Sequence, residues 1–263
     1  MGNVSERRKQ PPQVGVSVVI LALGPVPQSD VGAGAASSGM GSTLWMPLVK
    51  RARPPFLGQW ALPGGGLRAD HSLEQSAYAA LESTTSLHPK YLEQLYTFGD
   101  PARSHGGLPM VSIVYWALVG EADGRIDFAG GDNVKWFPVN HLPELAFDHR
   151  TIVEYAMNRL RGKIESPDIA TRLVGERFTL SQLHDVYEAI AGQRIDLANF
   201  RRKMLASGLL EDTGEKLRIG RNRPAAVYRP GTDLWTEAGT ASESDDTRIA
   251  FQDDDALSAL MTA

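Results

Sequence analysis

The 263-residue chain contains no cysteine, which excludes disulfide bonds and thiolate zinc sites. No apolar run approaches the roughly 18 residues that a membrane-spanning helix needs, and the polar first residues do not resemble a signal peptide. None of the six histidines forms a close His-x-x-x-His pair, so we predict no metal site. These absences lead us to expect a cytoplasmic protein with no membrane attachment.

The charge of the chain is unevenly distributed. Residues 231–263 hold eight acidic side chains and one arginine, a charge of −7, so residues 1–230 sum to +3. We expect residues 1–12 and this acidic tail to be disordered. The remaining chain divides into two predicted domains, residues 13–163 and 164–230, because residues 164–167 have the composition of a linker.

A glycine-rich stretch, Trp60–Leu87 (WALPGGGLRADHSLEQSAYAALESTTSL), organises the first domain. Pro63 should end an apolar strand, and the three glycines from Gly64 to Gly66 should form a turn. Ser72 can then cap a helix. The apolar positions of this helix are Leu73, Ala77, Ala80, Leu81 and Thr84.

Strands and a second helix surround this stretch in the sequence. The β-branched, apolar run Gln13–Leu23 predicts a strand, and Thr43–Lys50 predicts its returning partner in a hairpin closed by the Gly/Ala/Ser/Pro loop Gly24–Ser42. Further strands are predicted at Tyr91–Asp100, at Val111–Val119 and within Asp127–Val139. A helix should run from its cap, Asp148, to Gly162. The first domain therefore mixes helix and sheet.

The second domain has the order of a winged helix-turn-helix. Thr179 and Gln182 form a predicted capping box for a helix that ends at Gly192, and Asp196 caps a second helix that ends near Gly208. The second helix should bury Leu197, Phe200, Met204 and Leu205. A hairpin follows, with Lys216–Ile219 pairing with Ala225–Tyr228 around the basic tip Gly220–Pro224.

The charge pattern of this second domain favours nucleic acid. Between Arg194 and Arg229 nine basic residues stand against four acidic ones, a net charge of +5 within 36 residues. A compact basic surface neutralises phosphates, and a recognition helix carries polar side chains into the major groove. The alternative is a solvated helix face. We favour DNA binding because the helix, the wing and the charge coincide.

The glycine-rich stretch resembles the Nudix box, G-x5-E-x7-R-E-U-x-E-E-x-G-U, in which U is a bulky aliphatic residue. On this chain the first glycine is Gly65. The acidic positions fall on His71, Ala80, Ser83 and Thr84, and the late glycine falls on Ser86. A working box places carboxylates on one helix face to hold divalent cations. That face lacks them here, so we predict no metal-dependent hydrolysis and no catalytic residues.

Two further motifs extend the resemblance. The run RARPPFLGQWALPGG is typical of Nudix relatives that handle ADP-ribose, and a Gly-Asp-Pro-x-Arg turn follows at residues 99–103. Together with FTLSQLHDVYEAI and NFRRKMLASGLLE in the second domain, the chain resembles the NrtR family of Nudix-related regulators of NAD metabolism. The resemblance covers about residues 14–230.

The resemblance implies an α+β protein with an N-terminal Nudix-like α/β/α domain that senses an effector and forms a homodimer. The C-terminal winged helix would bind a palindromic operator in double-stranded DNA, and ADP-ribose would release it. ADP-ribose acts there as an effector, not a cofactor, and most such proteins repress NAD synthesis or salvage genes.

Candidate site residues follow by position. The effector candidates are Arg53, Gly65, Gly66, Asp100 and Arg103, and the DNA candidates are Asn199, Arg201, Arg202, Lys203, Arg221 and Arg223. Arg51 is a second choice beside Arg53, since either guanidinium can match a diphosphate. Asp100 is equally consistent with an Asx turn, Trp60 favours the core, and His149 at a helix start favours a structural role.

Two other functions remain open. One alternative is an ADP-ribose hydrolase with an appended interaction domain, although no convincing set of catalytic carboxylates is apparent. The other is a DNA-binding protein whose Nudix half serves only for dimerisation. Binding of ADP-ribose and release of phosphate in the presence of Mg²⁺ distinguish these alternatives from an effector-sensing repressor.

Overall fold

The computed structural model describes residues 12–27, 41–104, 109–120, 126–164, 167–218 and 223–231. The predicted disorder of residues 1–12 and of the acidic tail falls almost entirely outside this range, as do most of the Gly24–Ser42 loop and Arg221. None of the helices in the described part of the chain is long and apolar enough to cross a membrane.

Within the described residues, a seven-stranded sheet has the path β3-β2-β1-β6-β5, with β4 paired to β1 and β7 to β2. Its strands are β1 (Gln13–Pro25), β2 (Ser42–Lys50), β3 (Trp60–Ala61), β4 (Gly64–Gly66), β5 (Tyr91–Phe98), β6 (Met110–Val119) and β7 (Val134–Pro138). The β1–β2 hairpin is antiparallel, whereas β1 and β6 are parallel. The strands predicted from the sequence are therefore confirmed to within a few residues.

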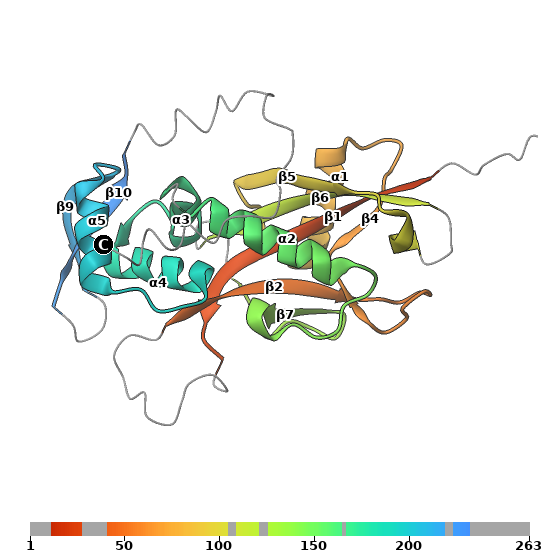
Figure 1. Cartoon of the computed structure of the whole chain (residues 1–263), viewed down its shortest axis with the longest axis horizontal. Helices are drawn as coiled ribbons and strands as arrows, with labels where there is room; N and C mark the ends of the chain where they lie inside the picture. Colours follow the sequence, from red (N-terminus) through yellow and green to blue (C-terminus); the bar gives the residue numbers. More distant parts are fainter. Residues whose placement is uncertain are drawn as a thin grey trace, which may run out of the picture.

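Helices cover both faces of this sheet (Figure 1). The α-helices of the described residues are α1 (Leu73–Thr85), α2 (His149–Gly162), α3 (Pro167–Val174), α4 (Leu180–Ala191) and α5 (Leu197–Ala206), with short 3-10 turns η2 (Pro101–Ser104) and η4 (Val139–His141). A three-stranded sheet, β8 (Phe178–Thr179), β10 (Ala225–Pro230) and β9 (Leu210–Leu217), completes the fold. It lies with α5 at one end of the molecule (Figure 1).

The alternation of β1 explains the layering. Val16, Val18 and Ile20 pack with Ala77 and Leu81 of α1, in the core cluster on one face of the sheet. The intervening residues of β1 point the other way, because successive side chains of a strand face opposite sides. That second face packs against α2, α3 and α4, so within the described residues α1 is the one helix on the first face.

The core on the second face continues into the C-terminal region. One cluster of buried residues includes Val19 and Leu21 of β1, Leu160 of α2, Leu183 of α4 and Phe200 of α5. Ile164, expected in a linker, is fully buried in the same cluster. The sheet and the C-terminal helices are therefore joined by shared apolar packing.

The glycine stretch differs from the expected turn. Gly64–Gly66 form a strand that pairs antiparallel with Gly15–Ser17 of β1. A Cβ atom on Gly64 would lie 2.3 Å from the Val16 carbonyl oxygen, so the close approach of the two backbones requires glycine there. The reason for the difference is that β1 is long enough to pair with β4 at one end and with β2 at the other.

The predicted helix caps are confirmed at three of four positions. Ser72 with Gln75, and Thr179 with Gln182, form capping boxes, and the Asp196 side chain accepts a hydrogen bond from the Asn199 N–H. Asp148 occupies the N-cap of α2, but its side chain makes no cap hydrogen bond. Its carboxylate is bound by Arg103 instead.

The predicted core of α5 is only half correct. Phe200 and Met204 are buried, whereas Leu197 is 37% exposed and Leu205 is 54% exposed. Phe200 and Met204 lie one turn apart, so they form the narrow apolar side of this short helix that packs into the core. Leu197 and Leu205 lie on either side of it and remain exposed. The β9–β10 pairing is confirmed, with Lys216 opposite Ala226 and Leu217 opposite Ala225.

Candidate effector pocket and nucleic-acid surface

A cavity of about 710 Å³ opens beside the glycine strand. Its walls come from the start of β1, from β4, from the β5–β6 connection and from the residues just before α2. Gly64–Gly66 supply one wall with no side chains, so backbone groups there are accessible to a ligand. Two arginines, Arg51 and Arg103, contribute positive charge.

Arg51 is held in a fixed position at the cavity. Its Nε donates to the Pro55 carbonyl oxygen at 2.9 Å, and its guanidinium lies 4.5 Å from the centre of the Phe147 ring. Stacking on an aromatic face leaves the guanidinium edge able to bind anions. Arg53, which the sequence favoured, is exposed and does not line the cavity.

Arg103 is the most buried cation of the cavity, with its side chain 5% exposed. Its Nε donates to Asp148 Oδ2 at 2.9 Å and its Nη2 donates to Asp148 Oδ1 at 3.0 Å. Nη1 donates to the Phe98 carbonyl oxygen at 3.0 Å. Burial alone would raise the pKa of Asp148, but the hydrogen bonds and charge of Arg103 lower it overall.

His149 forms part of the cavity wall at the first turn of α2. Its Nδ1 accepts a hydrogen bond from the Leu62 N–H at 2.9 Å, so the neutral ring carries its proton on Nε2. Burial lowers the pKa of His149 to about 4, which keeps the ring neutral at pH 7. The cavity therefore contains a neutral N–H donor beside the two arginines.

Three of the five sequence-derived effector candidates line this cavity: Gly65, Gly66 and Arg103. Asp100 does not, and its Oδ1 accepts from the Ala102 N–H at 2.7 Å, which is the Asx-turn geometry. Phe147 and His149 also line the cavity. Nothing in the sequence pattern marked Phe147, which enters the site because its φ of 56° turns the chain before α2.

The box positions on α1 carry no carboxylate. The hydroxyls of Ser83 and Thr84 both donate to the carbonyl oxygen of Ala80, at 3.0 and 2.7 Å. Ser86, at the position of the late glycine, keeps the left-handed conformation with φ 55°. The helix end of the motif is preserved although the glycine is lost, at the cost of an unfavourable backbone conformation for serine.

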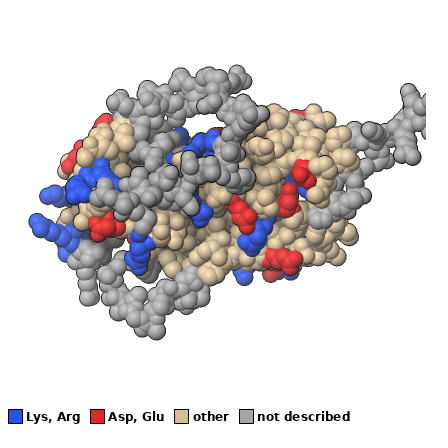
Figure 2. Space-filling model, in the orientation of Figure 1, with Lys and Arg blue, Asp and Glu red and all other residues tan. Residues whose placement is uncertain are grey.

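Lys and Arg side chains gather at the opposite end of the molecule, around α5, with some acidic side chains among them (Figures 1 and 2). Arg201 and Arg202 are exposed on α5, and Asn199 and Lys203 are half-buried. The Arg201 Nη2 donates to Ser181 Oγ on α4 at 3.0 Å, and the Arg202 Nη2 donates to Asn199 Oδ1 at 2.6 Å. Arg223 is exposed at the described edge of the wing.

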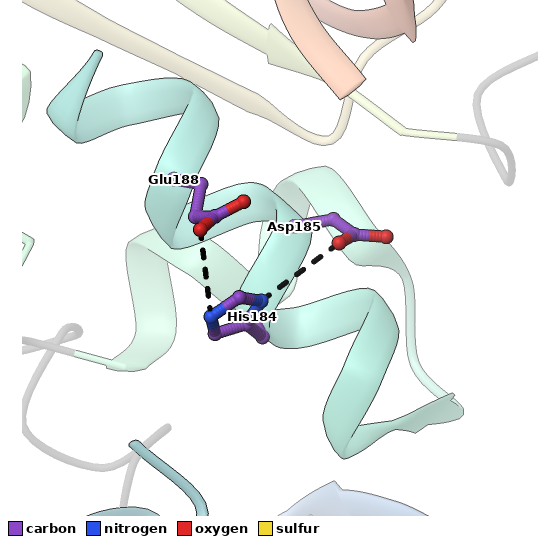
Figure 3. Close-up of side chains that lie close together, drawn as sticks. All are labelled: His184, Asp185 and Glu188. Carbon is purple, nitrogen blue, oxygen red and sulfur yellow. Dashed lines mark ion pairs between the residues drawn. The ribbon is translucent and has the colours of Figure 1, made fainter. Parts of the chain in front are cut away.

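A cluster of polar side chains fixes the turn between α4 and α5. His184, Asp185 and Glu188 approach one another on α4, with their candidate ligand atoms within 4.8 Å (Figure 3). His184 Nε2 lies 2.8 Å from the Ile195 carbonyl oxygen, and Glu188 Oε1 accepts from the Ile195 N–H at 2.9 Å. Both backbone groups of Ile195 are thus held by α4, so we interpret the cluster as a clamp that orients α5 rather than as a metal site.

Comparisons with known proteins identify both halves. Residues 33–156 match the model of the NUDIX domain, and residues 170–229 match the model of the NrtR DNA-binding winged helix domain. The chain is 32% identical over 186 residues to the "ADPR responsive transcriptional repressor NtrR" of Acinetobacter baylyi, covering 69% of this chain and 74% of the relative.

Two further relatives, one a regulator bound to DNA and one an enzyme, are similar to this chain. The crystal structure of Shewanella oneidensis NrtR complexed with a 27mer DNA superposes with a TM-score of 0.65 at 34% identity, covering 85% of this chain and 95% of that one. An ADP-ribose pyrophosphatase of Methanocaldococcus jannaschii is 33% identical over 118 residues, which cover 44% of this chain and 67% of the enzyme.

Proposed function

Because the chain belongs to the NrtR family of Nudix-related regulators, we propose that it is a DNA-binding transcriptional repressor controlled by ADP-ribose. One observation carries the proposal: a single buried apolar core connects the sheet that forms the cationic, glycine-walled cavity with the helices of the basic helix-turn-helix. We assign residues 13–163 to effector binding and dimerisation and residues 164–230 to DNA binding. The regulated genes would be those of NAD synthesis or salvage.

The chemistry of the cavity suits a nucleoside diphosphate sugar. Glycine backbone N–H groups and arginines are the usual ligands of phosphate oxygens, and the neutral His149 offers its Nε2–H to a hydroxyl. We therefore propose Gly65, Gly66 and Arg103 as effector residues and add Arg51, which lines the cavity. Arg53 and Asp100 remain candidates only if the loop around Arg53 or the turn at Asp100 moves on binding.

The DNA surface requires a pair of subunits. A two-fold dimer presents two recognition helices about 34 Å apart, one turn of DNA, and so reads a palindrome. We propose that Asn199, Arg201, Arg202 and Lys203 of α5 contact the major groove and its phosphates. Arg221 and Arg223 of the wing would contact the adjacent backbone or minor groove.

A hydrolase is the second candidate, since one relative is an ADP-ribose pyrophosphatase. The box positions of this chain argue against it, because His71, Ala80, Ser83 and Thr84 replace the carboxylates that would hold Mg²⁺. A bound effector would then persist without hydrolysis, which suits a sensor. Incubation with ADP-ribose and Mg²⁺ should yield no AMP and no ribose phosphate.

The direct test measures binding to a labelled DNA fragment from upstream of the host's NAD-synthesis genes while ADP-ribose is titrated. We expect specific binding that ADP-ribose relieves. A variant with Arg201→Ala and Arg202→Ala should lose the fragment but still bind ADP-ribose. Specific binding that is indifferent to ADP-ribose would contradict the proposed effector while leaving the winged-helix assignment intact.

A further inference from the structure

Asp148 stands between the cavity and the helix that leads away from it. It is the N-cap of α2, and its carboxylate is held by two hydrogen bonds from Arg103 in the cavity wall. The three α-helices α1, α4 and α5 begin with an extended N-cap residue whose side chain caps the helix. Asp148 instead has φ −93° and ψ 19°, and its side chain makes no cap hydrogen bond.

The carboxylate of Asp148 therefore has two mutually exclusive uses. An aspartate at an N-cap ordinarily accepts hydrogen bonds from the first-turn N–H groups of its own helix, with its backbone in the extended region. Pairing with Arg103 diverts the side chain from that role. The preceding residue, Phe147, has φ 56°, a left-handed conformation that a phenylalanine rarely adopts. The chain thus enters α2 through two unusual backbone conformations.

A phosphate in the cavity would compete with Asp148 for the same guanidinium. Arg103 lines the cavity, and a side chain that is 5% exposed has little freedom to serve two anions at once. A diphosphate that takes the Nε and Nη2 hydrogens of Arg103 leaves Asp148 without its counter-ion and beside new negative charge. The α2 N–H groups then become the nearest compensating partners for the carboxylate.

Helix α2 is placed to transmit such a change. Its first turn carries His149 in the cavity wall, and its last turn carries Arg161, whose Nε donates to the Ile190 carbonyl oxygen of α4 at 3.3 Å. Its buried residues Ile152, Ala156 and Leu160 share one core cluster with Leu183 of α4 and Phe200 of α5. In Figure 1, α2 runs from the cavity end of the sheet toward α4.

We propose that Asp148 is the positioning residue that couples effector binding to DNA binding. Paired with Arg103, it holds α2 in the DNA-competent arrangement. When a phosphate of the effector takes Arg103, Asp148 turns to cap α2, its backbone moves toward the extended region, and α2 shifts against α4. The inference rests on the proposed function and specifies how the same cavity is regulated.

The test compares full-length wild type with Asp148→Asn, measuring ADP-ribose affinity by calorimetry and operator affinity with and without ADP-ribose. Asparagine caps helices well but does not form the ion pair. We expect ADP-ribose to bind about tenfold more tightly to the variant, within the usual range of coupling effects, because no carboxylate competes for Arg103. Operator binding without effector should weaken, and the ratio of operator affinities without and with ADP-ribose should fall toward one.

The matched control is Glu93→Gln. It breaks the ion pair between Glu93 and Lys163, which is the C-cap residue at the other end of α2. This variant should keep both wild-type affinities and their ratio. Asp148→Ser, another capping residue without charge, repeats the test if the asparagine variant fails to fold. A merely structural Asp148 would predict weaker effector binding in both variants, not tighter.

The outcomes separate the two proposals. If the wild type releases its operator with ADP-ribose and the Asp148 variants keep wild-type effector affinity and the full ratio, the coupling role of Asp148 is wrong and the repressor function stands. If wild-type binding of ADP-ribose and of DNA are independent, the proposed function fails, and this inference fails with it.

Discussion

The two sets of arginines in this protein are held in opposite ways. In the cavity, Arg103 is almost completely buried, and it donates hydrogen bonds to a carboxylate and to two backbone carbonyls. On α5, Arg201 and Arg202 are exposed, and each donates a hydrogen bond to a neutral side chain. One set is fixed before any ligand arrives, and the other lies in water.

This contrast corresponds to two kinds of anion. A small ligand is bound best by groups that are already oriented, because little conformational entropy is lost on binding. A DNA backbone is a long array of charge, and its affinity for a basic surface comes largely from the release of condensed counter-ions. Effector binding should therefore depend weakly on salt and DNA binding strongly.

The largest expected effect tests whether the two regions that carry these arginines also unfold separately. Phe200 of α5 is 1% exposed and packs against His184 and Tyr187. Phe200→Ala should lower the free energy of unfolding by about 3–5 kcal/mol through the cavity it leaves. Because the core is continuous, the tryptophans of the sheet should report the same shift in a denaturant titration. A sheet transition that stays at the wild-type midpoint would show that the halves unfold independently.

The next prediction concerns the cavity alone and describes how the stability of the fold changes as the pH falls. Burial lowers the pKa of His149 to about 4 in the folded protein, against about 6.5 when unfolded. The folded state thus binds fewer protons, so the stability from the neutral ring is complete above about pH 6.5 and is lost as pH falls toward 4. The loss is roughly 3 kcal/mol.

Urea titrations at several pH values measure this dependence, with His149→Gln as the comparison. The glutamine variant should show a flatter profile between pH 6.5 and 4. Asp148, whose pKa is lowered in the folded protein, loses its own stabilisation only as the pH approaches and falls below the ordinary aspartate value of about 3.9, so the slope between about pH 6.5 and 5 is the part that reports His149. An unchanged slope in the variant would assign the acid sensitivity to other groups.

A third prediction sharpens the contrast between the arginines directly. Arg202→Ala should weaken operator binding and, because a phosphate contact is lost, reduce the slope of log affinity against log salt by about 0.9. Arg51→Ala should weaken ADP-ribose binding with no change in the salt slope for DNA. Measurements at several salt concentrations distinguish them, and an equal salt dependence of the two ligands would refute the contrast.

The smallest effect uses two helix caps as matched controls. Ser72→Ala and Asp196→Ala each remove a side-chain cap, and each should cost about 1 kcal/mol of stability. Only the second should also weaken DNA binding, because Asp196 fixes the start of α5. Thermal unfolding and operator titration of both variants check this. Equal DNA affinity in the two variants would indicate that the clamp around Ile195 orients α5 without the cap.

Local chemistry made much of the fold predictable. The cap at Ser72 and the capping box at Thr179 depend on residues three apart in sequence, and the alternation of β1 depends on nearest neighbours, so both could be predicted from the sequence. The family resemblance, carried by the broken box and the winged-helix motifs, supplied the functional class. The two relatives with regulator names support that class.

Contacts between residues far apart in the sequence were harder to predict. The sequence favoured Arg53 over Arg51, but the conformation of the intervening loop places Arg51 against Phe147. Asp148 was expected to cap α2, but an arginine 45 residues earlier in the chain binds its carboxylate. Leu197 and Leu205 were expected in the core, but both are exposed. Which residues of α5 are buried depends on which side of the helix packs against α4, and the sequence of α5 alone does not show that.

The parallel pairing of β1 with β6 has a consequence for how the chain is made. The first ten residues of β1 each pair with a residue 97 positions later, from Gln13 with Met110 to Ala22 with Val119. A ribosome adds about 5–20 residues per second, so the central strand waits roughly 5–20 s for its partner to be synthesised. During that interval β1 has only the hairpin and the glycine strand to pair with. Such long-range pairing is slow, and we expect the sheet to close only after β6 has left the ribosome.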